Sequence, residues 1–230
     1  MISLLDGLAT TRAIRRYTDD PIPEDDLATM LWHATRAPSG SNRQPFRFLV
    51  LRDSPMAREV KALLGRSFRD NWSDKQRADG YATGSGLDDT SPKARMARTM
   101  QHFVDHFEAT PVVVLPCYVR YRNPNPYDGA SVYPACQNLL LAARALGYGG
   151  VITIWHAFVE AELRELLRLP EDVVIAATIP LGKPAGRHGP VRRRPVSELV
   201  YEDRWDAPAA WAVDPEGTRF TAAGPPRPRG

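Results

Sequence analysis

Apolar side chains recur every three to four residues in six stretches of the chain, and this spacing predicts helices. The predicted helices cover residues 3–8, 23–34, 54–64, 93–108, 130–146 and 160–169. Ser3 and Ser54 stand at the starts of two of them, where a serine hydroxyl accepts a hydrogen bond from the first turn. Acidic residues follow Pro23 at the start of a third predicted helix, where negative charge interacts favourably with the positive end of the helix dipole.

Four further apolar runs lack the helical spacing and predict strands, at residues 46–51, 112–119, 151–155 and 173–181. The second and fourth runs are apolar almost throughout, which is typical of strands buried on both faces. Because helices alternate with these strands, we expect a sheet with helices packed on both sides. No G-x-G-x-x-G motif follows the first strand, which argues against a Rossmann nucleotide site.

Two segments show no periodicity. Residues 73–92 are polar and rich in glycine, and a loop of this length inside a compact domain is usually functional or disordered. After Trp205 the chain is rich in proline, glycine and alanine, which predicts a mobile or partner-wrapping tail. We therefore expect one domain over residues 1–205 and a C-terminal tail over residues 206–230.

The composition narrows the class of protein. With 43% hydrophobic residues, the chain can bury a sizeable core. The net charge of +3 is mild and the basic groups lie in short clusters, which fits a phosphate-bearing ligand better than a nucleic-acid surface. Cys117 and Cys136 lack metal-ligand or C-x-x-C spacing, so we expect buried thiols and a cytoplasmic protein. We expect no signal peptide and no membrane contact, because Asp6 interrupts the first apolar run and no run reaches about 18 residues.

A polar loop at residues 37–46, with the sequence APSGSNRQPF, separates a predicted helix from a predicted strand. Its two prolines prevent helix continuation and Gly40 loosens the backbone. Ser39, Asn42 and Gln44 are among the loop side chains that can donate or accept hydrogen bonds. The loop is either a simple turn or a cradle for a ligand with many hydrogen-bonding edges.

Two arginine clusters lie near the start and the end of the predicted domain, at residues 12–16 and 192–194. Each is either a solvated basic surface or a phosphate site, since guanidinium groups match phosphate geometry. Arg192 and Arg194 alternate, so they share one side of an extended segment. Together with the polar loop, the clusters indicate an anionic cofactor rich in heteroatoms.

Other candidate residues have a structural and a functional interpretation. Gly149 and Gly150 either end a helix or let the backbone approach a planar ligand. The histidines at 102, 106 and 156 are not spaced as a metal set with carboxylates, and we interpret them as structural. No nucleophilic triad and no pair of catalytic carboxylates stands out in the sequence.

Taken together, these motifs resemble the FMN-dependent nitroreductase family. The resemblance rests on RAIRRY at 12–17, DPIP at 20–23, APSGSNRQPF at 37–46, ALGYGGV at 145–151, PLGKP at 180–184 and RRRP at 192–195. It runs from about Leu8 to Leu199. It implies an α+β fold, a three-layer αβα sandwich with a central sheet flanked by helices, in an interlocked homodimer with two FMN sites at the interface.

The resemblance also implies roles for particular residues. Arg12, Arg192 and Arg194 would hold the FMN phosphate, and Arg15 would lie by the flavin N1 and O2 edge. The other subunit would contribute Pro38, Ser39, Gly40 and Asn42, with Gln44 supporting or joining that contact. Backbone around Gly150, Thr153 and Ile154 would face the isoalloxazine.

This chain departs from the family pattern at three positions. Ala13 stands where the family often has a phosphate-binding serine, Thr11 where it often has arginine, and Phe46 where many members have tryptophan. Arg12 therefore carries more of the expected phosphate contact.

The resemblance implies an NAD(P)H-dependent FMN oxidoreductase with ping-pong kinetics. NADPH or NADH would give a hydride to flavin N5, and a small acceptor such as a nitroaromatic or quinone would then take it. The alternatives are other flavin chemistry on this scaffold, such as reductive dehalogenation or flavin cleavage, and flavin storage without turnover. The segment 66–92 and the aromatics Phe68, Trp72, Tyr81, Phe103 and Phe107 would form the variable wall over the flavin, with core packing the favoured alternative for Phe103 and Phe107.

Overall fold

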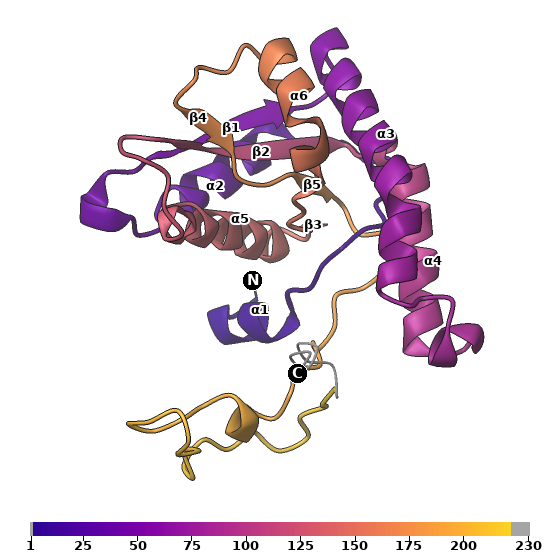
Figure 1. Cartoon of the computed structure of the whole chain (residues 1–230), viewed down its shortest axis with the longest axis vertical. Coiled ribbons are helices and arrows are strands. Elements are labelled where there is room, and N and C mark those ends of the chain that lie inside the picture. Colours follow the sequence, from indigo (N-terminus) through magenta and orange to yellow (C-terminus); the bar gives the residue numbers. More distant parts are fainter. Residues whose placement is uncertain (1, 222–230) are drawn as a thin grey trace. The chain divides into compact units, whose positions relative to one another are not determined.

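A five-stranded antiparallel sheet lies at the centre of the chain (Figure 1). The computed structural model describes residues 2–221, which fall into two compact units divided between His188 and Gly189. In the first unit the strand order is β1 (Phe46–Leu51), β2 (Val112–Val119), β5 (Ile179–Gly182) and β3 (Gly149–Gly150), with β4 (Val173–Ile175) also paired to β2.

Strand β2 is buried on both faces, as its apolar sequence predicts. Val112 and Val114 join a cluster with α2 (Glu24–Ala34) and α5 (Tyr133–Ala145). Val113, Leu115 and Cys117 point the other way, because side chains alternate along a strand. Their cluster includes α3 (Pro55–Ala78), α4 (Pro92–Asp105) and α6 (Glu160–Leu166). The expectation of a central sheet flanked by helices in an α+β fold is confirmed.

Three of the helices have a serine at the N-cap whose hydroxyl accepts a hydrogen bond from the first turn. Ser3 accepts a hydrogen bond from Asp6 N at the start of α1 (Leu4–Thr10), and Ser54 accepts one from Ala57 N at the start of α3. Both caps were expected from the sequence. Ser91 caps α4 in the same way through Ala94 N.

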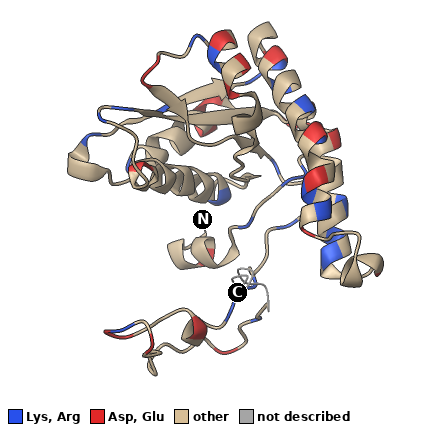
Figure 2. Ribbon diagram, viewed as in Figure 1, with Lys and Arg blue, Asp and Glu red and all other residues tan. Residues whose placement is uncertain are grey.

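Helix α3 extends further than its apolar pattern indicates. The prediction of a loop from residue 73 is wrong for its first six residues, because the helix continues to Ala78. The added turns carry intrahelical ion pairs, Lys75 with Asp79 (2.8 Å) and Arg77 with Asp74, which favour helix without adding apolar periodicity. Figure 2 shows how densely charges line α3 and α4.

The start of α5 also differs from the prediction. The helix begins at Tyr133 and not at residue 130, because Asp128–Ser131 form a short 3₁₀ turn before it. On the opposite side of the sheet, Phe103 and Phe107 pack in the core, which confirms the favoured alternative for these two aromatics. Phe68 and Trp72, expected in the wall over the flavin, lie in the same core cluster.

Two predicted strands differ from the structure. The strand predicted over 151–155 is wrong, because β3 covers only Gly149–Gly150 and, within 151–155, Thr153 alone forms an isolated bridge, to Thr178. The run 173–181 divides into β4 and β5. Cys117 pairs with Ile175 and Val114 with Ile179, so one extra residue bulges out opposite Pro116, which has no N–H to donate.

The second unit, described to residue 221, has little core of its own. Ala209 and Ala212 are its buried hydrophobic residues, and its one helical turn is the 3₁₀ segment Val196–Glu198. Its described part exposes large apolar side chains at Leu199, Tyr201, Trp205, Trp211, Val213 and Phe220. Residues 222–230 of the expected C-terminal tail lie outside the described residues, and the 205/206 boundary stays a prediction. Between residues 2 and 221 no helix is long and apolar enough to cross a bilayer.

Candidate functional site

The extended segment before α2 is attached to one edge of the sheet. Ile14 N donates to Gly150 O (2.9 Å), and Thr18 N donates to Lys183 O (2.9 Å). The Tyr17 hydroxyl lies 2.6 Å from Ile14 O and 3.1 Å from Pro180 O. These bonds place the first arginine cluster beside β3 and β5, although the two strands lie far from it in the sequence.

The arginines of this segment have no acidic partner. Among residues 2–221, no carboxylate lies within ion-pair distance of Arg12, Arg15 or Arg16, although ten other ion pairs form. Arg15 Nη1 lies 4.0 Å from the Met96 sulfur. Burial lowers the pKa of Arg15, and the positive charge of Arg12 acts in the same direction. A partly buried guanidinium without a carboxylate is poised for an external anion.

Gly150 is required by the sheet itself. A Cβ at this position would lie 2.6 Å from Pro180 O and 2.6 Å from Leu181 Cδ2. The interpretation of Gly149 and Gly150 as a helix end is wrong, because both belong to β3. Residue 150 is glycine because its backbone packs closely against β5. The same residue accepts the hydrogen bond from Ile14 that attaches the arginine segment to the sheet.

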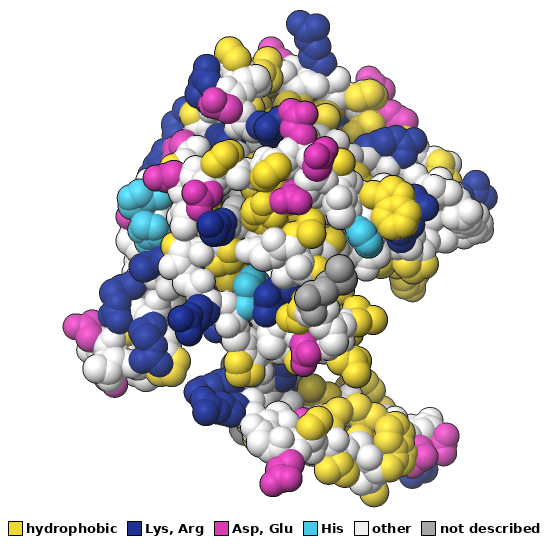
Figure 3. Space-filling view, turned by 180° about the vertical axis from the view of Figure 1, so that it is seen from behind, with side chains coloured by type: hydrophobic (Ala, Val, Ile, Leu, Met, Phe, Trp, Pro, Cys, Tyr) yellow, Lys and Arg dark blue, Asp and Glu magenta, His cyan; other side chains and the backbone are white. Residues whose placement is uncertain are grey.

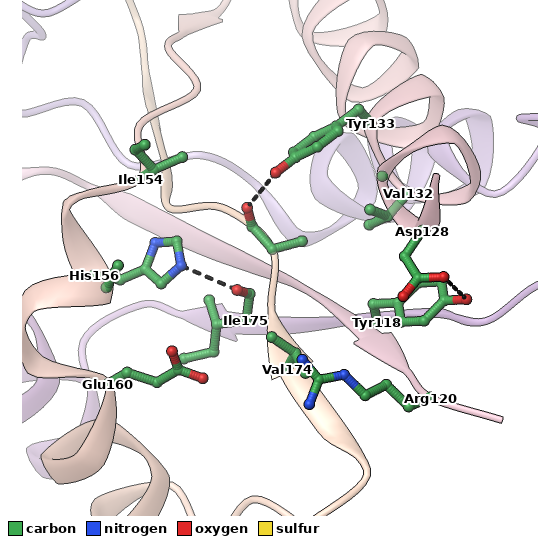
Figure 4. Close-up of a pocket in the computed structure, with 13 residues that line it drawn as sticks. Tyr118, Arg120, Asp128, Val132, Tyr133, Ile154, His156, Glu160, Val174 and Ile175 are labelled. Atoms are coloured by element: carbon green, nitrogen blue, oxygen red, sulfur yellow. Dashed lines mark hydrogen bonds between the residues drawn. The ribbon is translucent and has the colours of Figure 1, made fainter. Parts of the chain in front are cut away.

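Thr153 and Ile154 follow at the same edge. Thr153 exchanges two backbone hydrogen bonds with Thr178, at 3.0 and 2.8 Å. The side chain of Ile154 is 61% exposed, so the edge presents an apolar group to solvent. Ile154 also lines a pocket of about 290 Å³ together with His156 and Tyr133 (Figure 4).

His156 in this pocket is a structural residue, as the sequence analysis expects. Its side chain is 4% exposed, and Nε2 lies 3.0 Å from Ile175 O. Burial lowers the pKa of His156, so the imidazole is neutral near pH 7. No metal-binding group of three or more His, Cys, Asp or Glu residues occurs in the part of the chain that the structure describes.

The polar loop adopts an unusual backbone. Ser41, Asn42 and Gln44 have φ values of 51°, 51° and 50°, in the left-handed region that non-glycine residues seldom adopt. Ser39 Oγ accepts a hydrogen bond from Gln44 N (2.9 Å), and Gln44 Nε2 donates to Asn42 Oδ1 (3.2 Å). Gln44 thus supports Asn42. Strain of this kind is characteristic of ligand-binding loops.

A hollow of about 620 Å³ lies beside the loop. Pro38, Ser39 and Gly40 line one part of it. Another part holds Tyr121, whose ring centroid lies 4.9 Å from the guanidinium carbon of Arg43 and 5.3 Å from that of Arg122. None of these three residues was predicted as a contact. Arg43 belongs to the polar loop 37–46, and the signal for Tyr121 and Arg122 is the RYR triplet at 120–122, directly after a buried strand.

The predicted site residues of the first unit gather in two places. Arg12, Ala13, Arg15, Gly150, Thr153 and Ile154 belong to the edge formed by β3, while Pro38 to Gln44 form the separate loop. Figure 1 shows this loop, between α2 and β1, at the end of the first unit opposite α4, against which Arg15 lies. One chain does not bring the two groups together.

The second arginine cluster belongs to the second unit. Arg194 donates from Nε to a Glu198 carboxylate oxygen at 2.8 Å, so part of its guanidinium is already bound. The backbone carbonyl of Arg192 accepts a hydrogen bond from Arg193 Nη1 (3.0 Å). The sequence analysis did not foresee the pairing of Arg194 with Glu198.

Comparison with known proteins adds to this geometry. A model of the Nitroreductase family matches residues 8–183. A candidate NADH dehydrogenase/NAD(P)H nitroreductase of Archaeoglobus fulgidus is 30% identical over 191 residues, covering 80% of this chain and 87% of its own. A candidate nitroreductase from Desulfovibrio desulfuricans, solved in complex with FMN, is 29% identical with a TM-score of 0.63, covering 89% of this chain and 99% of that one. An iodotyrosine deiodinase of Thermotoga neapolitana is 26% identical over 201 residues, covering 87% of this chain and 97% of its own.

Proposed function

Because this chain belongs to the nitroreductase family of flavin oxidoreductases, we propose that it binds FMN and passes electrons from NADPH or NADH to a small acceptor. A nitroaromatic or a quinone is the acceptor class we favour. The observation that carries the proposal is that Arg12 and Arg15, fixed beside β3, have no carboxylate within ion-pair distance among residues 2–221. The FMN complex of the Desulfovibrio desulfuricans relative supports the choice of cofactor.

The residues present fit FMN. A phosphate monoester carries between one and two negative charges near pH 7, and the unpaired guanidinium of Arg12 matches that charge. In this proposal Ala13 contributes only backbone, and the phosphate contacts of Arg192 and Arg194 stay predictions from the family resemblance. The backbone at Gly150, Thr153 and Ile154 faces the ring system, where the exposed Ile154 side chain offers apolar contact.

Arg15 tunes the chemistry in this proposal. FMN, when bound, would supply the electron transfer between NADPH or NADH and the acceptor. The Arg15 guanidinium would lie by the N1 and O2 edge and would stabilise the negative charge that reduction creates there. It is partly buried, so its field is less screened by water than that of a surface cation. We assign no side-chain acid or base.

A homodimer completes the site in this proposal. The loop 38–44 and the arginine segment lie apart within one chain, so a loop from a second copy supplies Pro38, Ser39, Gly40 and Asn42. Helix α1 supports the same arrangement. Leu4 and Leu5 are 71% and 76% exposed, and Leu8 is also exposed, an apolar face typical of surfaces that a partner covers.

Flavin binding tests the proposal directly. The purified protein should be yellow or take up FMN with flavin absorption, and NADPH or NADH should bleach it before a nitroaromatic restores the colour. Arg15→Ala should weaken FMN binding by roughly tenfold or more and slow reduction, as expected for loss of a charged hydrogen-bond donor. Arg58→Ala is a matched control, since Arg58 pairs with Asp53 on the surface. A colourless protein that fails to take up FMN would overturn the proposal.

The subunit arrangement has its own test. Sedimentation of the wild-type protein should show a dimer, and Leu5→Glu should shift it toward monomer. FMN affinity should fall in parallel, because each site then loses the loop of its partner. A wild-type monomer that binds FMN with full affinity would contradict the shared site.

Reductive dehalogenation is a second candidate function. The relative named iodotyrosine deiodinase supports it, at 26% identity. Mixing the reduced protein with a nitroaromatic, a quinone and 3-iodotyrosine in separate experiments distinguishes the acceptors by their reoxidation rates. A protein that binds FMN but is reduced by neither NADPH nor NADH would instead be a flavin-binding protein without turnover.

A further inference from the structure

A second group of basic side chains lies where the N-terminal extended segment meets the last turns of α4. Arg16, His102 and His106 line a cavity of about 160 Å³ there. The rest of its wall comes from Arg15, Tyr17, Asp19, Phe103, Ala109 and Thr110. Neither the flavin site nor the core uses the side chains of Arg16, His102 and His106.

The two histidines form a stacked pair. They are four residues apart, with His102 in the last turn of α4 and His106 at its C-cap, which places them on the same side of the helix end. Their ring centroids are 4.2 Å apart with an interplanar angle of 26°. His106 Nδ1 lies 2.9 Å from the backbone oxygen of His102, so this nitrogen is the donor, and Nε2 has no hydrogen-bond partner among residues 2–221. Figure 3 shows two histidine side chains side by side at one edge of the molecule.

Positive charge predominates around the pair. Arg16 has no carboxylate within ion-pair distance in residues 2–221, and burial, His106 and Arg16 all lower the pKa of His102. Asp105 opposes this shift, but its carboxylate accepts hydrogen bonds from Gln101 Nε2 at 3.0 and 3.2 Å. Asp19, the other acid of the cavity, forms no ion pair with any of these groups.

We propose that Arg16, His102 and His106 form a binding site for a phosphate group. The Arg16 fork offers donors in the planar arrangement that phosphate oxygens accept, and protonated imidazoles add further donors. A phosphate dianion would balance the charge of Arg16, which forms no ion pair with a carboxylate within residues 2–221. A histidine pair can also hold a transition metal, but the guanidinium beside it repels a cation.

The site implies a coupling between anion binding and protonation. A phosphate group favours the charged imidazole, so binding should raise the pKa of His102 and should strengthen as the pH falls below 7. The source of the group is either free phosphate or the phosphate of a nucleotide such as NADPH. This proposal does not depend on the flavin, because none of its three residues belongs to the proposed FMN site.

Histidine NMR provides the test, on the protein with and without added FMN. Inorganic phosphate, added at constant ionic strength, should shift the His102 ring signals saturably and raise the pKa of His102 by about one unit. Arg16→Ala should weaken this binding by roughly tenfold, and Arg16→Lys by less, because lysine keeps the charge but loses the fork. His33→Gln, which changes an exposed histidine on α2, is the matched control and should bind phosphate as the wild type does.

Parallel titrations identify the source. A tighter response to NADP⁺ than to inorganic phosphate, with none to NAD⁺, assigns the site to the nucleotide phosphate. An equal or stronger response to inorganic phosphate assigns it to the free ion. No saturable shift with either compound, a response that Arg16→Ala leaves unchanged, or binding of Zn²⁺ alone would overturn the proposal.

Discussion

The ring of Tyr17 occupies the space that a side chain at Gly182 would need. A Cβ on Gly182 would lie 2.8 Å from Cδ1 of Tyr17, inside van der Waals contact. Tyr17 cannot easily move away, because its hydroxyl is bonded to the carbonyls of Ile14 and Pro180. The end of β5 and the arginine segment therefore fit together only when residue 182 is glycine.

Gly182→Ala should destabilise the protein. Forcing one methyl group into this contact should lower the free energy of unfolding by about 1–3 kcal/mol, the usual cost of overpacking. Urea unfolding measures the change. Gly186→Ala is the matched control, since a Cβ there meets nothing within 4 Å, and it should leave the midpoint unchanged. Equal midpoints for the two variants would show that the segment can relax around Tyr17.

Tyr17→Phe should keep the packing of the ring and lose the hydrogen bonds of the hydroxyl that hold the arginine segment. The Ile14 carbonyl, 2.6 Å from the hydroxyl, would lose its short hydrogen bond at a cost of about 1–2 kcal/mol. Thermal unfolding should show the loss, and Tyr127→Phe, which changes an exposed phenol, should not. If the two variants unfold alike, the Tyr17 hydroxyl does not hold the segment.

Lys61 is a buried ammonium group that joins α3 to the ends of two strands. Its Nζ donates to Arg52 O (2.6 Å), Thr110 O (2.7 Å) and Pro111 O (3.3 Å). Lys61→Met should cost about 2–4 kcal/mol, because carbonyls at the strand ends lose their donor. Lys75→Met, at an exposed ion pair, should change the free energy of unfolding by less than about 0.5 kcal/mol. Equal losses in both variants would argue against a special role for Lys61.

Alkaline pH should destabilise the protein through its buried thiols. Burial raises the pKa of Cys117 to about 11 and that of Cys136 to about 12, from an ordinary value of 9.0. The unfolded chain ionises first, so stability is intact below pH 9 and falls as the pH rises toward 11 and 12. Each thiol should contribute up to about 1.4 kcal/mol per pH unit in that range.

Urea unfolding at pH 8.0 and at pH 10.5, or about those values, measures this effect. The double variant Cys117→Val and Cys136→Ala should show a shallower loss of stability between the two pH values than the wild type. Only the difference between pH values matters, so a lower baseline stability of the variant does not affect the test. An identical slope would mean that other groups, such as Tyr148 with its pKa raised to about 12, dominate.

Local signals in the sequence predicted much of the fold. The caps at Ser3 and Ser54 and the apolar run of β2 were found because each depends on a few neighbouring residues. The end of α3 was missed because ion pairs, and not apolar periodicity, support its last turns. The break between β4 and β5 was missed because it depends on Pro116 in a strand that is distant in sequence.

For the candidate site, the sequence by itself determined the family through its motifs, and it identified the arginines and the polar loop as candidate contacts. Their roles stay predictions. Only the tertiary structure decided that Ile14 bonds to Gly150, that the loop lies apart from this edge, and that the Tyr121 ring contacts two guanidinium groups. Motifs are local in the chain, whereas pairing between distant segments depends on how the whole core packs.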